Sequence, residues 1–481
     1  MRLNNIWSYY VLYGGGSDKP QWSVLKHNGP LFPPPYIPHH IPVVIHNKEV
    51  ILPPLAEEYA TMYSRYIDTD YIVNKTFNKN FWKDFKKVLP EELSKDLSLE
   101  GIDFLLIKKH LDSEKEKKNS ITKEEKEHNK AKQNEVEEPY MNCIIDGITQ
   151  KVGNYRIEPP GIFIGRGNHP KLGRIKKRIM PENITLNLSK DAKVPEPNIH
   201  GHKWGKIIHD RHVIWLATWK EDITGKNKYI FTSFESMFKS KSDEDKFDLA
   251  RKLKKKVISI RMEYEKHLYD SNKRNQQLAT ALYLIDTMAL RVGGSKDTKE
   301  QADTVGVSSL RVEHIEFLDK NKIKLDFLSK DSIRYLKTVA VHEMVYTNLK
   351  LFCNNKHKKD DIFDLVSASD INSYLNSYME GLTAKVWRTF NASLLFQKEI
   401  DMIKEDKINS IDSNGKLNYL IAMFNQANAK VALLCNHQKA ASSSLDKTLS
   451  KINTRIKELK IRREKAKSKD RIKSISERIR H

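Results

Sequence analysis

The sequence is poor in cysteine and in long apolar runs. Its 481 residues include only three cysteines, Cys143, Cys353 and Cys435. They lie too far apart for a disulfide framework or an all-cysteine metal site. The best apolar stretches, residues 279–290 and 419–435, are short or interrupted by polar residues such as Asp286. Both fall below the roughly 20 residues of a membrane span, and the first residues lack the pattern of a signal peptide. We therefore expect a reducing compartment and no membrane.

Nucleotide and metal motifs are also missing. No Gly-x-x-x-x-Gly-Lys-Ser/Thr pattern is present, which excludes a P-loop for a nucleotide. The stretch 165–170 begins like a dinucleotide fingerprint, but Pro170 stands where the third glycine is needed. A metal could use the spacings of four histidines, His200, His202, His209 and His212. Only Asp210 could complete their ligand set, so we favour surface or phosphate-contacting histidines and expect no cofactor.

Negative charge is in short supply. The chain has 84 Lys plus Arg against 62 Asp plus Glu, a formal net charge of +22. Such a surplus favours a polyanionic partner, because cationic side chains that neutralise phosphates release counterions. Residues 439–481 alone carry 15 basic and five acidic side chains. With no segment suited to lipid, nucleic acid is the expected partner.

The chain changes character several times along its length. Eight of the 17 prolines fall between Pro30 and Pro54, which predicts an extended segment wrapped over a surface. A helical pattern starts at about residue 57 and places Phe81, Phe85 and Val88 on one face. Residues 114–138 are dense in alternating charge, typical of a solvated helix or linker, with a binding element as the alternative.

Strands and helices alternate in the rest of the chain. Residues 213–219 and 229–231 are predicted strands around a turn at 225–227, and helices resume at about residue 243. A cluster of three strands is predicted at 315–317, 323–327 and 333–335. Helices continue from there to about Asn436. The heptad spacing of Leu445, Leu449, Ile452, Ile456 and Leu459 is typical of a coiled coil. Ile472, Ile475 and Ile479 predict a second, antiparallel arm.

A basic run near the middle of the first half could follow a phosphate chain. Its side chains lie among three glycines that let a backbone approach closely, and its members are Arg166, His169, Lys171, Arg174, Lys176, Lys177 and Arg178. A solvated charged loop is an equal alternative for this run by itself.

At three further places, a basic residue lies in or next to a predicted helix or apolar stretch that would hold it in position. Arg291 is expected to end a helix whose apolar face is Leu278, Leu282, Ile285 and Ala289. Thr383 is expected to cap another helix, in which Val386, Phe390 and Leu394 point inward and Arg388 points away. His437 follows the apolar stretch 431–435. Taken singly, each of these residues is better explained by a salt bridge or a core histidine.

Together these segments resemble eukaryotic DNA topoisomerase I, the type IB family. The matching motifs, in the family's order, are ALRVG (289–293), ADTVG (302–306), SLRVEHI (309–315), FLSKDSIRY (327–335), GLTAKVWRTFNAS (381–393) and LCNHQ (434–438). Upstream matches are GP (29–30), PPY (34–36), EPPG (158–161) and IMPE (179–182). The resemblance covers about Trp22 to Gln438. Motifs this long and ordered are highly specific.

The resemblance implies an α+β multidomain protein that clamps duplex DNA. Residues 1–230 would form a mixed cap of strands and helices, with charged helices near 105–138. Residues 231–438 would form a mainly α-helical catalytic domain with a small β-hairpin sheet, and 439–481 a truncated coiled-coil linker arm. The family relaxes supercoils in the nucleus by transient single-strand cleavage through a 3′-phosphotyrosine, without ATP or metal.

The resemblance also implies roles for single residues. Arg291 and Arg388 would clamp the non-bridging oxygens of the attacked phosphate, and His437 would be a third donor. Lys330 would be the general acid for the leaving 5′ oxygen. Asp331 and the basic run from Arg166 to Arg178 would contact DNA.

The chain differs from the family in the position of its last tyrosine. The family's nucleophile lies after the linker, whereas the last tyrosine here is Tyr419, in a helix expected to lead into His437. Eighteen residues of helix would separate Tyr419 from His437 by roughly 27 Å, so we expect core packing for Tyr419. The chain would be a fragment, or would need a separate tyrosine-bearing small subunit. Ile164 stands where the family usually has arginine, which would cost one phosphate contact. A non-catalytic DNA-binding clamp and, less favoured, a tyrosine recombinase are the alternatives.

Overall fold

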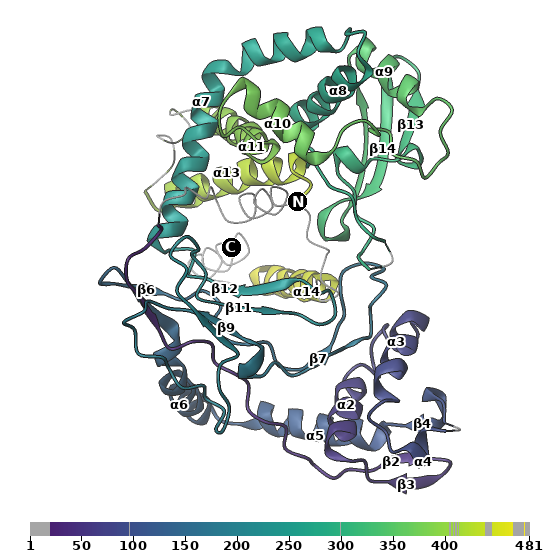
Figure 1. Cartoon of the computed structure of the whole chain (residues 1–481), viewed down its shortest axis with the longest axis vertical. Helices are drawn as coiled ribbons and strands as arrows, with labels where there is room; N and C mark the ends of the chain where they lie inside the picture. Colours follow the sequence, from purple (N-terminus) through teal and green to yellow (C-terminus); the bar gives the residue numbers. More distant parts are fainter. Residues whose placement is uncertain are drawn as a thin grey trace. The chain divides into compact units, whose positions relative to one another are not determined.

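The computed structural model describes residues 20–95, 97–298, 300–403, 406, 408, 411, 413–437, 445–464 and 476 (Figure 1). The chain divides into two compact units, Met1–Leu394 and Leu395–His481. The first unit is built from both helices and small sheets, which agrees with the mixed α+β class in its coarse form, and the described elements of the second unit are helices. We describe each unit by itself.

The first core of the large unit is formed by short helices against a small sheet. The sheet has the order β3-β2-β4 and consists of β2 (Val43–Ile45), β3 (Lys48–Val50) and β4 (Ile102–Asp103). The helices are α2 (Pro54–Ser64), α3 (Lys75–Phe85) and α4 (Glu91–Ser94). Phe77, Phe81 and Phe85 of α3 are completely buried, which confirms the predicted apolar face for Phe81 and Phe85, whereas Val88 lies beyond the end of α3 and is partly buried. The Asn74 side chain caps α3 by accepting the N–H groups of Thr76 and Phe77.

The proline-rich segment is extended, as predicted, and a buried carboxylate holds it. Glu57 is fully buried in α2 and accepts hydrogen bonds from the Tyr36 hydroxyl at 2.7 Å and the His39 backbone N–H at 2.8 Å. The His40 N–H donates to the second oxygen of Glu57 at 3.0 Å. One acidic side chain therefore fixes a segment that has few backbone donors of its own.

The charged stretch is a pair of solvated helices, as predicted, and a role in binding stays untested. They are α5 (Leu105–Ser120) and α6 (Lys123–Met141), and a capping box between Thr122 and Glu125 starts the second. Glu137 is the one buried residue of α6, and it accepts a hydrogen bond from the Tyr155 hydroxyl at 2.7 Å. The other side chains of α6 extend into solvent, where their alternating charges cost little.

Two sheets form the second core. One has the order β1-β5-β6, with β1 (Leu25–His27), β5 (Asn142–Ile145) and β6 (Ile148–Lys151). The other has the order β10-β9-β11-β12, with β9 (Thr185–Asn187), β10 (Lys206–Ile208), β11 (Ala217–Lys220) and β12 (Asn227–Ile230). A short ribbon pairs β7 (Gly161–Ile162) with β8 (Ile175–Lys176).

The strand predicted at 213–219 is wrong in its first half. The structure assigns a strand only from Ala217, and residues 213–216 are irregular. The Val213 carbonyl bonds outside any ladder, since it accepts a hydrogen bond from the Trp22 indole at 2.8 Å. The turn at 225–227 joins β11 and β12 as expected.

The third and largest core surrounds α8 (Lys273–Met288). It also includes α7 (Met237–His267), which begins before the predicted residue 243, and α9 (Glu343–Cys353), α10 (Ala368–Tyr378) and α11 (Ala384–Asp401). The predicted strand cluster is confirmed as the antiparallel sheet β13 (Ile315–Leu318), β14 (Lys322–Leu328) and β15 (Arg334–Ala340). Single 3-10 turns are η1 (Leu99–Gly101), η2 (Pro181–Asn183), η3 (Val307–Ser309), η4 (Val312–His314) and η5 (Lys330–Ser332).

The small unit contains α13 (Ser413–Leu434) and α14 (Leu445–Glu464). The first arm of the predicted coiled coil is therefore a helix, and Leu459 in its heptad seam is buried while Leu449 and Ile452 are half exposed. The second arm, with Ile472 to Ile479, lies outside the described residues, so the pairing stays a prediction. No helix in the described part of the chain is long and apolar enough to cross a bilayer.

Burial of His27 generates a prediction about pH. The Nε2 atom of His27 donates to the Asn187 carbonyl at 2.9 Å, and Nδ1 accepts the Gly29 N–H at 3.0 Å. Burial lowers the pKa of His27 to about 4. In the unfolded chain, His27 binds a proton below its pKa of about 6.5, whereas in the folded chain it stays neutral down to about pH 4. We expect this residue to remove about 2 kcal/mol of stability between pH 7.5 and pH 5.

Urea denaturation at both pH values checks this expectation. In His27→Gln the loss between pH 7.5 and pH 5 should be smaller by about that amount, because the amide does not titrate. His212→Gln, at an exposed site, is the matched control and should keep the full loss. An unchanged loss in His27→Gln would contradict the assignment.

Candidate functional site

Arg291 lies three residues beyond Met288, the last residue of α8, and not at the helix end, which corrects the sequence-based expectation. Ala289 ends the helix because it adopts a left-handed conformation with φ of 50°. The Arg291 carbonyl then accepts the Val307 N–H at 2.9 Å, and the Ser308 N–H donates to the Val292 carbonyl at 2.7 Å. These bonds hold the Arg291 segment extended against residues 306–308, so that the arginine stands on a fixed backbone.

Two glycines let these segments cross. A Cβ on Gly306 would lie 2.4 Å from the Gly293 Cα, and one on Gly293 would lie 2.7 Å from the Gly306 Cα. Gly293 also has φ of 83°, a conformation that L side chains rarely adopt. The glycines that follow Arg291 thus position it by close backbone packing.

Helix α11 positions Arg388 next to the backbone segment that leads to Arg291. The Thr383 hydroxyl accepts the Val386 N–H at 3.3 Å, which confirms the predicted cap. From this helix, the Arg388 Nη1 donates to the Ala289 carbonyl at 2.5 Å. The guanidinium of Arg388 therefore contacts the backbone two residues before Arg291.

The predicted inward face of α11 is right in part. Val386 and Phe390 are buried, but Leu394 is 41% exposed, and that part of the prediction is wrong. Leu394 lies about one turn past Asn391, whose side chain donates to the Asp286 carbonyl at 2.6 Å. The fully buried Trp387 supplies apolar volume to the core that the pattern had not assigned.

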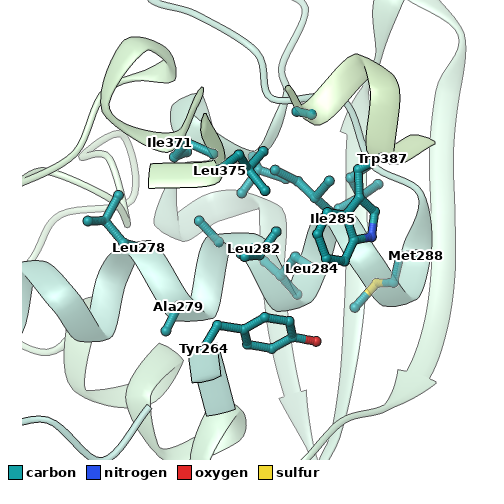
Figure 2. Close-up of a cluster of buried hydrophobic side chains, with 14 of the residues drawn as sticks. Tyr264, Leu278, Ala279, Leu282, Leu284, Ile285, Met288, Ile371, Leu375 and Trp387 are labelled. Carbon is teal, nitrogen blue, oxygen red and sulfur yellow. The ribbon is translucent and has the colours of Figure 1, made fainter. Parts of the chain in front are cut away.

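A buried carboxylate ties three helices together beside the two arginines. Asp286 of α8 is 5% exposed and accepts both Nε and Nη2 of Arg261 at 2.7 Å. It also accepts the Tyr264 hydroxyl at 2.8 Å and the Trp387 indole N–H at 3.0 Å. Figure 2 shows Tyr264 and Trp387 on either side of α8 at this level. Burial, and then the Asp286 charge, raise the pKa of Tyr264 far above its usual value. This network fixes α7 and α11 against the end of α8.

Lys330 stands at the tip of the hairpin between β14 and β15. Its side chain is exposed and, within the described residues, has no hydrogen bond or ion pair. The next two residues, Asp331 and Ser332, have φ of 68° and 59°. The Ser332 hydroxyl donates to the Arg166 carbonyl at 3.2 Å, and the Arg166 guanidinium pairs with Asp331. The hairpin that carries Lys330 thus contacts the loop that carries the basic run.

Much of the basic run is engaged within the protein. Five of its side chains form ion pairs, which are Arg166–Asp331, Lys171–Glu300, Arg174–Asp84, Lys176–Glu158 and Arg178–Glu58. Arg178 also donates to the Pro34 carbonyl at 2.8 Å, which ties the run to the proline-rich segment. Arg166 and Lys177 are exposed. Contact of this run with DNA stays a prediction, and much of its charge has a structural use.

His169 is buried in this loop. Its Nδ1 accepts the Lys171 N–H at 3.1 Å. Burial, together with the positive charges of Lys171 and Lys226, lowers the pKa of His169. A neutral imidazole can organise the loop but cannot neutralise a phosphate.

Three of the four histidines weighed as metal ligands have other partners, and the fourth, His200, is exposed. His202 contacts Glu182 at 3.0 Å, His209 Nδ1 donates to the Leu188 carbonyl at 2.7 Å, and His212 contacts Asp210 at 3.4 Å. Within the part of the chain that the structure describes, no three His, Cys, Asp or Glu residues gather as metal ligands would.

In the small unit, His437 follows the end of α13. Asn436 adopts φ of 50°, and the His437 N–H donates back to the Ala432 carbonyl at 2.8 Å. The imidazole is exposed. Tyr419 is half-buried in the same continuous helix, 15 residues before Leu434, or about 22 Å along the axis. That His437 joins Lys330 and the two arginines around one phosphate stays a prediction.

Sequence reasoning missed the residues that support these side chains. Asp286 was visible only as a polar interruption of an apolar stretch, and such an interruption is the available signal for a buried carboxylate. Arg311 was also missed. It makes a bidentate pair with Asp303 at 3.0 and 2.7 Å and a bond to Glu313 at 2.8 Å. This cluster braces the segment that packs against Arg291.

Comparison with known proteins identifies the family. Residues 20–232 match the family model described as "Eukaryotic DNA topoisomerase I, DNA binding fragment", and residues 235–470 match "Eukaryotic DNA topoisomerase I, catalytic core". The chain belongs to the eukaryotic DNA topoisomerase I family.

Curated relatives are similar over nearly the whole chain. DNA topoisomerase 1 of Candidozyma auris is 42% identical over 93% of this chain and 59% of its own length. The Caenorhabditis elegans protein is 41% identical over 95% of this chain and 58% of its own length. For the Homo sapiens protein the identity is 41%, over 91% of this chain and 57% of its own length. The chain thus spans less than three fifths of these relatives.

The Asp286 network predicts a large effect of a nearly isosteric change. Asp286→Asn should lower the free energy of unfolding by about 3 kcal/mol, because the half-buried Arg261 loses its counter-charge. Urea denaturation measures the effect. Asp364→Asn is the control, since Asp364 also accepts from a buried side chain, Gln277, at 2.7 Å but is itself half exposed. Its loss should be about 1 kcal/mol, and an equal loss in both variants would contradict the account.

Proposed function

We propose that this chain is the DNA-binding and catalytic core of a type IB DNA topoisomerase. In this proposal it surrounds duplex DNA and relaxes supercoils by transient cleavage of one strand, without ATP or a metal ion. The observation that carries the proposal is the contact of the Arg388 guanidinium with the Ala289 carbonyl, two residues from Arg291. This contact brings one guanidinium beside the backbone segment that carries the other arginine, and two guanidiniums acting together would suit the non-bridging oxygens of one phosphate.

The proposed chemistry is an exchange of phosphate esters. A tyrosine oxygen gives up its proton to water and bonds to the phosphorus, while the bond from phosphorus to the 5′ oxygen breaks and that oxygen takes a proton from Lys330. The reverse reaction reseals the strand. Arg291, Arg388 and His437 would donate to the oxygens on which negative charge builds. Lys330 is suited to the acid role because its exposed ammonium has no partner within the described residues. No hydrolysis occurs, so no external energy source is needed.

The tyrosine would come from outside these 481 residues. Tyr419 is the last tyrosine of the sequence, and it lies about four turns before the end of α13. A separate tyrosine-bearing subunit or a continuation of the chain would meet the need equally well. Without either, the chain would act as a non-catalytic DNA-binding clamp, which is the second candidate function.

Charge and domain order support duplex DNA as the partner. A net charge of +22 favours binding to a polyanion. We propose residues 1–230 as the DNA-binding cap, 231–438 as the catalytic domain and 439–481 as a basic coiled-coil arm. We propose that the protein acts in the nucleus, where duplex DNA is found.

The proposed function leads to a prediction about the purified chain alone. It should bind duplex DNA with an affinity that falls by about 10³-fold between 50 and 200 mM salt, because binding neutralises several phosphates. It should not relax a supercoiled plasmid. Fluorescence anisotropy and gel electrophoresis measure the two properties. If the unmodified chain relaxed the plasmid and Tyr419→Phe did not, the proposal that the nucleophilic tyrosine comes from outside these 481 residues would be contradicted.

The second prediction concerns restored activity. Supplying the tyrosine-bearing carboxyl-terminal segment of a relative as a separate polypeptide should produce plasmid relaxation. Arg388→Ala should lower the restored rate by at least about 10³-fold, since a charge-stabilising donor is lost. Arg251→Ala is the matched control, because Arg251 is an exposed α7 arginine paired with Asp248. Failure of the segment to restore any relaxation would favour the non-catalytic clamp.

A further inference from the structure

The tip of the Lys330 hairpin has an unfavourable backbone conformation. Asp331 and Ser332 are consecutive residues with left-handed φ values of 68° and 59°. Such pairs occur at other hairpin turns of this chain, at His46–Asn47 and Lys320–Asn321, but each residue with a Cβ pays a steric cost in this region, so contacts from outside the hairpin stabilise the pair. Within the hairpin, the Ser329 hydroxyl and backbone N–H both donate to the Ile333 carbonyl at 2.8 Å. These bonds close the turn but do not contact Asp331 or the Ser332 side chain.

The additional restraint comes from the loop at residues 165–169. The Arg166 guanidinium pairs with Asp331, and the Arg166 carbonyl accepts the Ser332 hydroxyl at 3.2 Å. Both left-handed residues are therefore bonded to a single residue, more than 160 positions earlier in the chain.

Gly167 shows how closely the loop and the hairpin fit. A Cβ at this position would lie 2.6 Å from the Ser332 Oγ and 2.7 Å from the Ser332 Cβ. Rotation of the serine side chain could move Oγ, but its Cβ is fixed to the backbone. Only a residue without a side chain at position 167 leaves the tip where it is.

We propose that the loop at 165–169 is a template that holds the Lys330 hairpin in its strained conformation, with Gly167 and Ser332 as positioning residues for Lys330. The inference rests on the proposed function, in which Lys330 is the general acid. Proton delivery would then depend on the loop, which belongs to the DNA-binding part of the chain. When the loop leaves the hairpin, the tip relaxes and the Lys330 ammonium moves off its line to the leaving oxygen. Cleavage would in this way be coupled to closure of the protein around DNA.

The proposed role concerns one step. As the bond from the tyrosine oxygen to phosphorus forms, the bond from phosphorus to the 5′ oxygen breaks, and that oxygen takes a proton from the Lys330 ammonium. A sulfur atom in place of the 5′ oxygen would leave as a thiolate without a proton, because a thiol has a pKa of about 8.5. A substrate with bridging sulfur therefore separates proton delivery from every other contribution to cleavage.

The experiment uses the full chain together with the tyrosine-bearing segment of a relative. The cleavage position on a duplex fragment is mapped first, and single-turnover cleavage is then measured with oxygen or sulfur at that bond. Gly167→Ala should cleave the oxygen substrate at least about tenfold more slowly, since general acid catalysis is impaired. On the sulfur substrate it should stay within about twofold of the unmodified chain.

Ser332→Gly provides the rescue. It removes both atoms that an alanine at position 167 would meet, and glycine adopts a left-handed conformation without penalty. In the Gly167→Ala background it should restore at least about half of the lost rate on the oxygen substrate. Gly201→Ala is the matched control, because Gly201, like Gly167, has a positive φ, of 81°, and a Cβ there meets nothing within 4 Å. Its rate should equal that of the unmodified chain on both substrates.

The outcomes are distinct. An equal slowing of Gly167→Ala on both substrates, or a slowing explained by weaker DNA binding in anisotropy, overturns the template role and leaves the proposed function intact. Loss of folding in Gly167→Ala without rescue by Ser332→Gly overturns it as well. Absence of cleavage of either substrate by the unmodified chain overturns the proposed function and the inference with it.

Discussion

The buried carboxylate of Asp286 is the interaction on which the proposed site depends. It accepts four hydrogen bonds from α7 and α11, and it lies one turn before the point where α8 ends. Its partner Trp387 directly precedes Arg388. Ala289 lies three residues after Asp286, and its carbonyl accepts a hydrogen bond from the Arg388 guanidinium. A carboxylate saturated in this way cannot shift without leaving a donor unpaired. The distance between the two arginine-bearing segments is therefore set by one acidic side chain.

Left-handed residues recur beside the proposed catalytic groups. Ala289 precedes Arg291 by two positions, Asp331 follows Lys330, and Asn436 precedes His437, all with φ between 50° and 68°. Each bends the chain sharply at the end of a helix or hairpin and exposes the residue of interest. Strain of this kind persists only where packing or hydrogen bonds enforce it, and the Gly293–Gly306 crossing shows such packing beside Arg291.

The sequence predicted the elements better than their ends and partners. The β13–β15 sheet, the solvated helices α5 and α6, and the Thr383 cap follow from local patterns of polarity and capping, and all were found. The early end of α8 and the exposure of Leu394 depend on how helices pack, which a one-dimensional pattern does not contain. The same holds for the basic run. Its composition predicted a phosphate-binding surface, but only the structure shows that Arg174 and Arg178 pair with Asp84 and Glu58.

The site itself was predictable only through motifs spread over nearly 150 residues. Composition indicated a polyanionic partner, while Arg291, Lys330, Arg388 and His437 gained meaning from their order and from the family resemblance. The supporting residue Asp286 carries no catalytic chemistry of its own and lies outside the matching motifs, and Gly306 lies within one of them without any sign of its close packing on Gly293.

The most direct test of the account is a structure of this chain bound to duplex DNA. We expect donor atoms of Arg291, Lys330, Arg388 and His437 within about 3 Å of oxygens on a single phosphate. Binding of the four side chains to different phosphates, or an arrangement in which either arginine faces away from the DNA, would contradict the account.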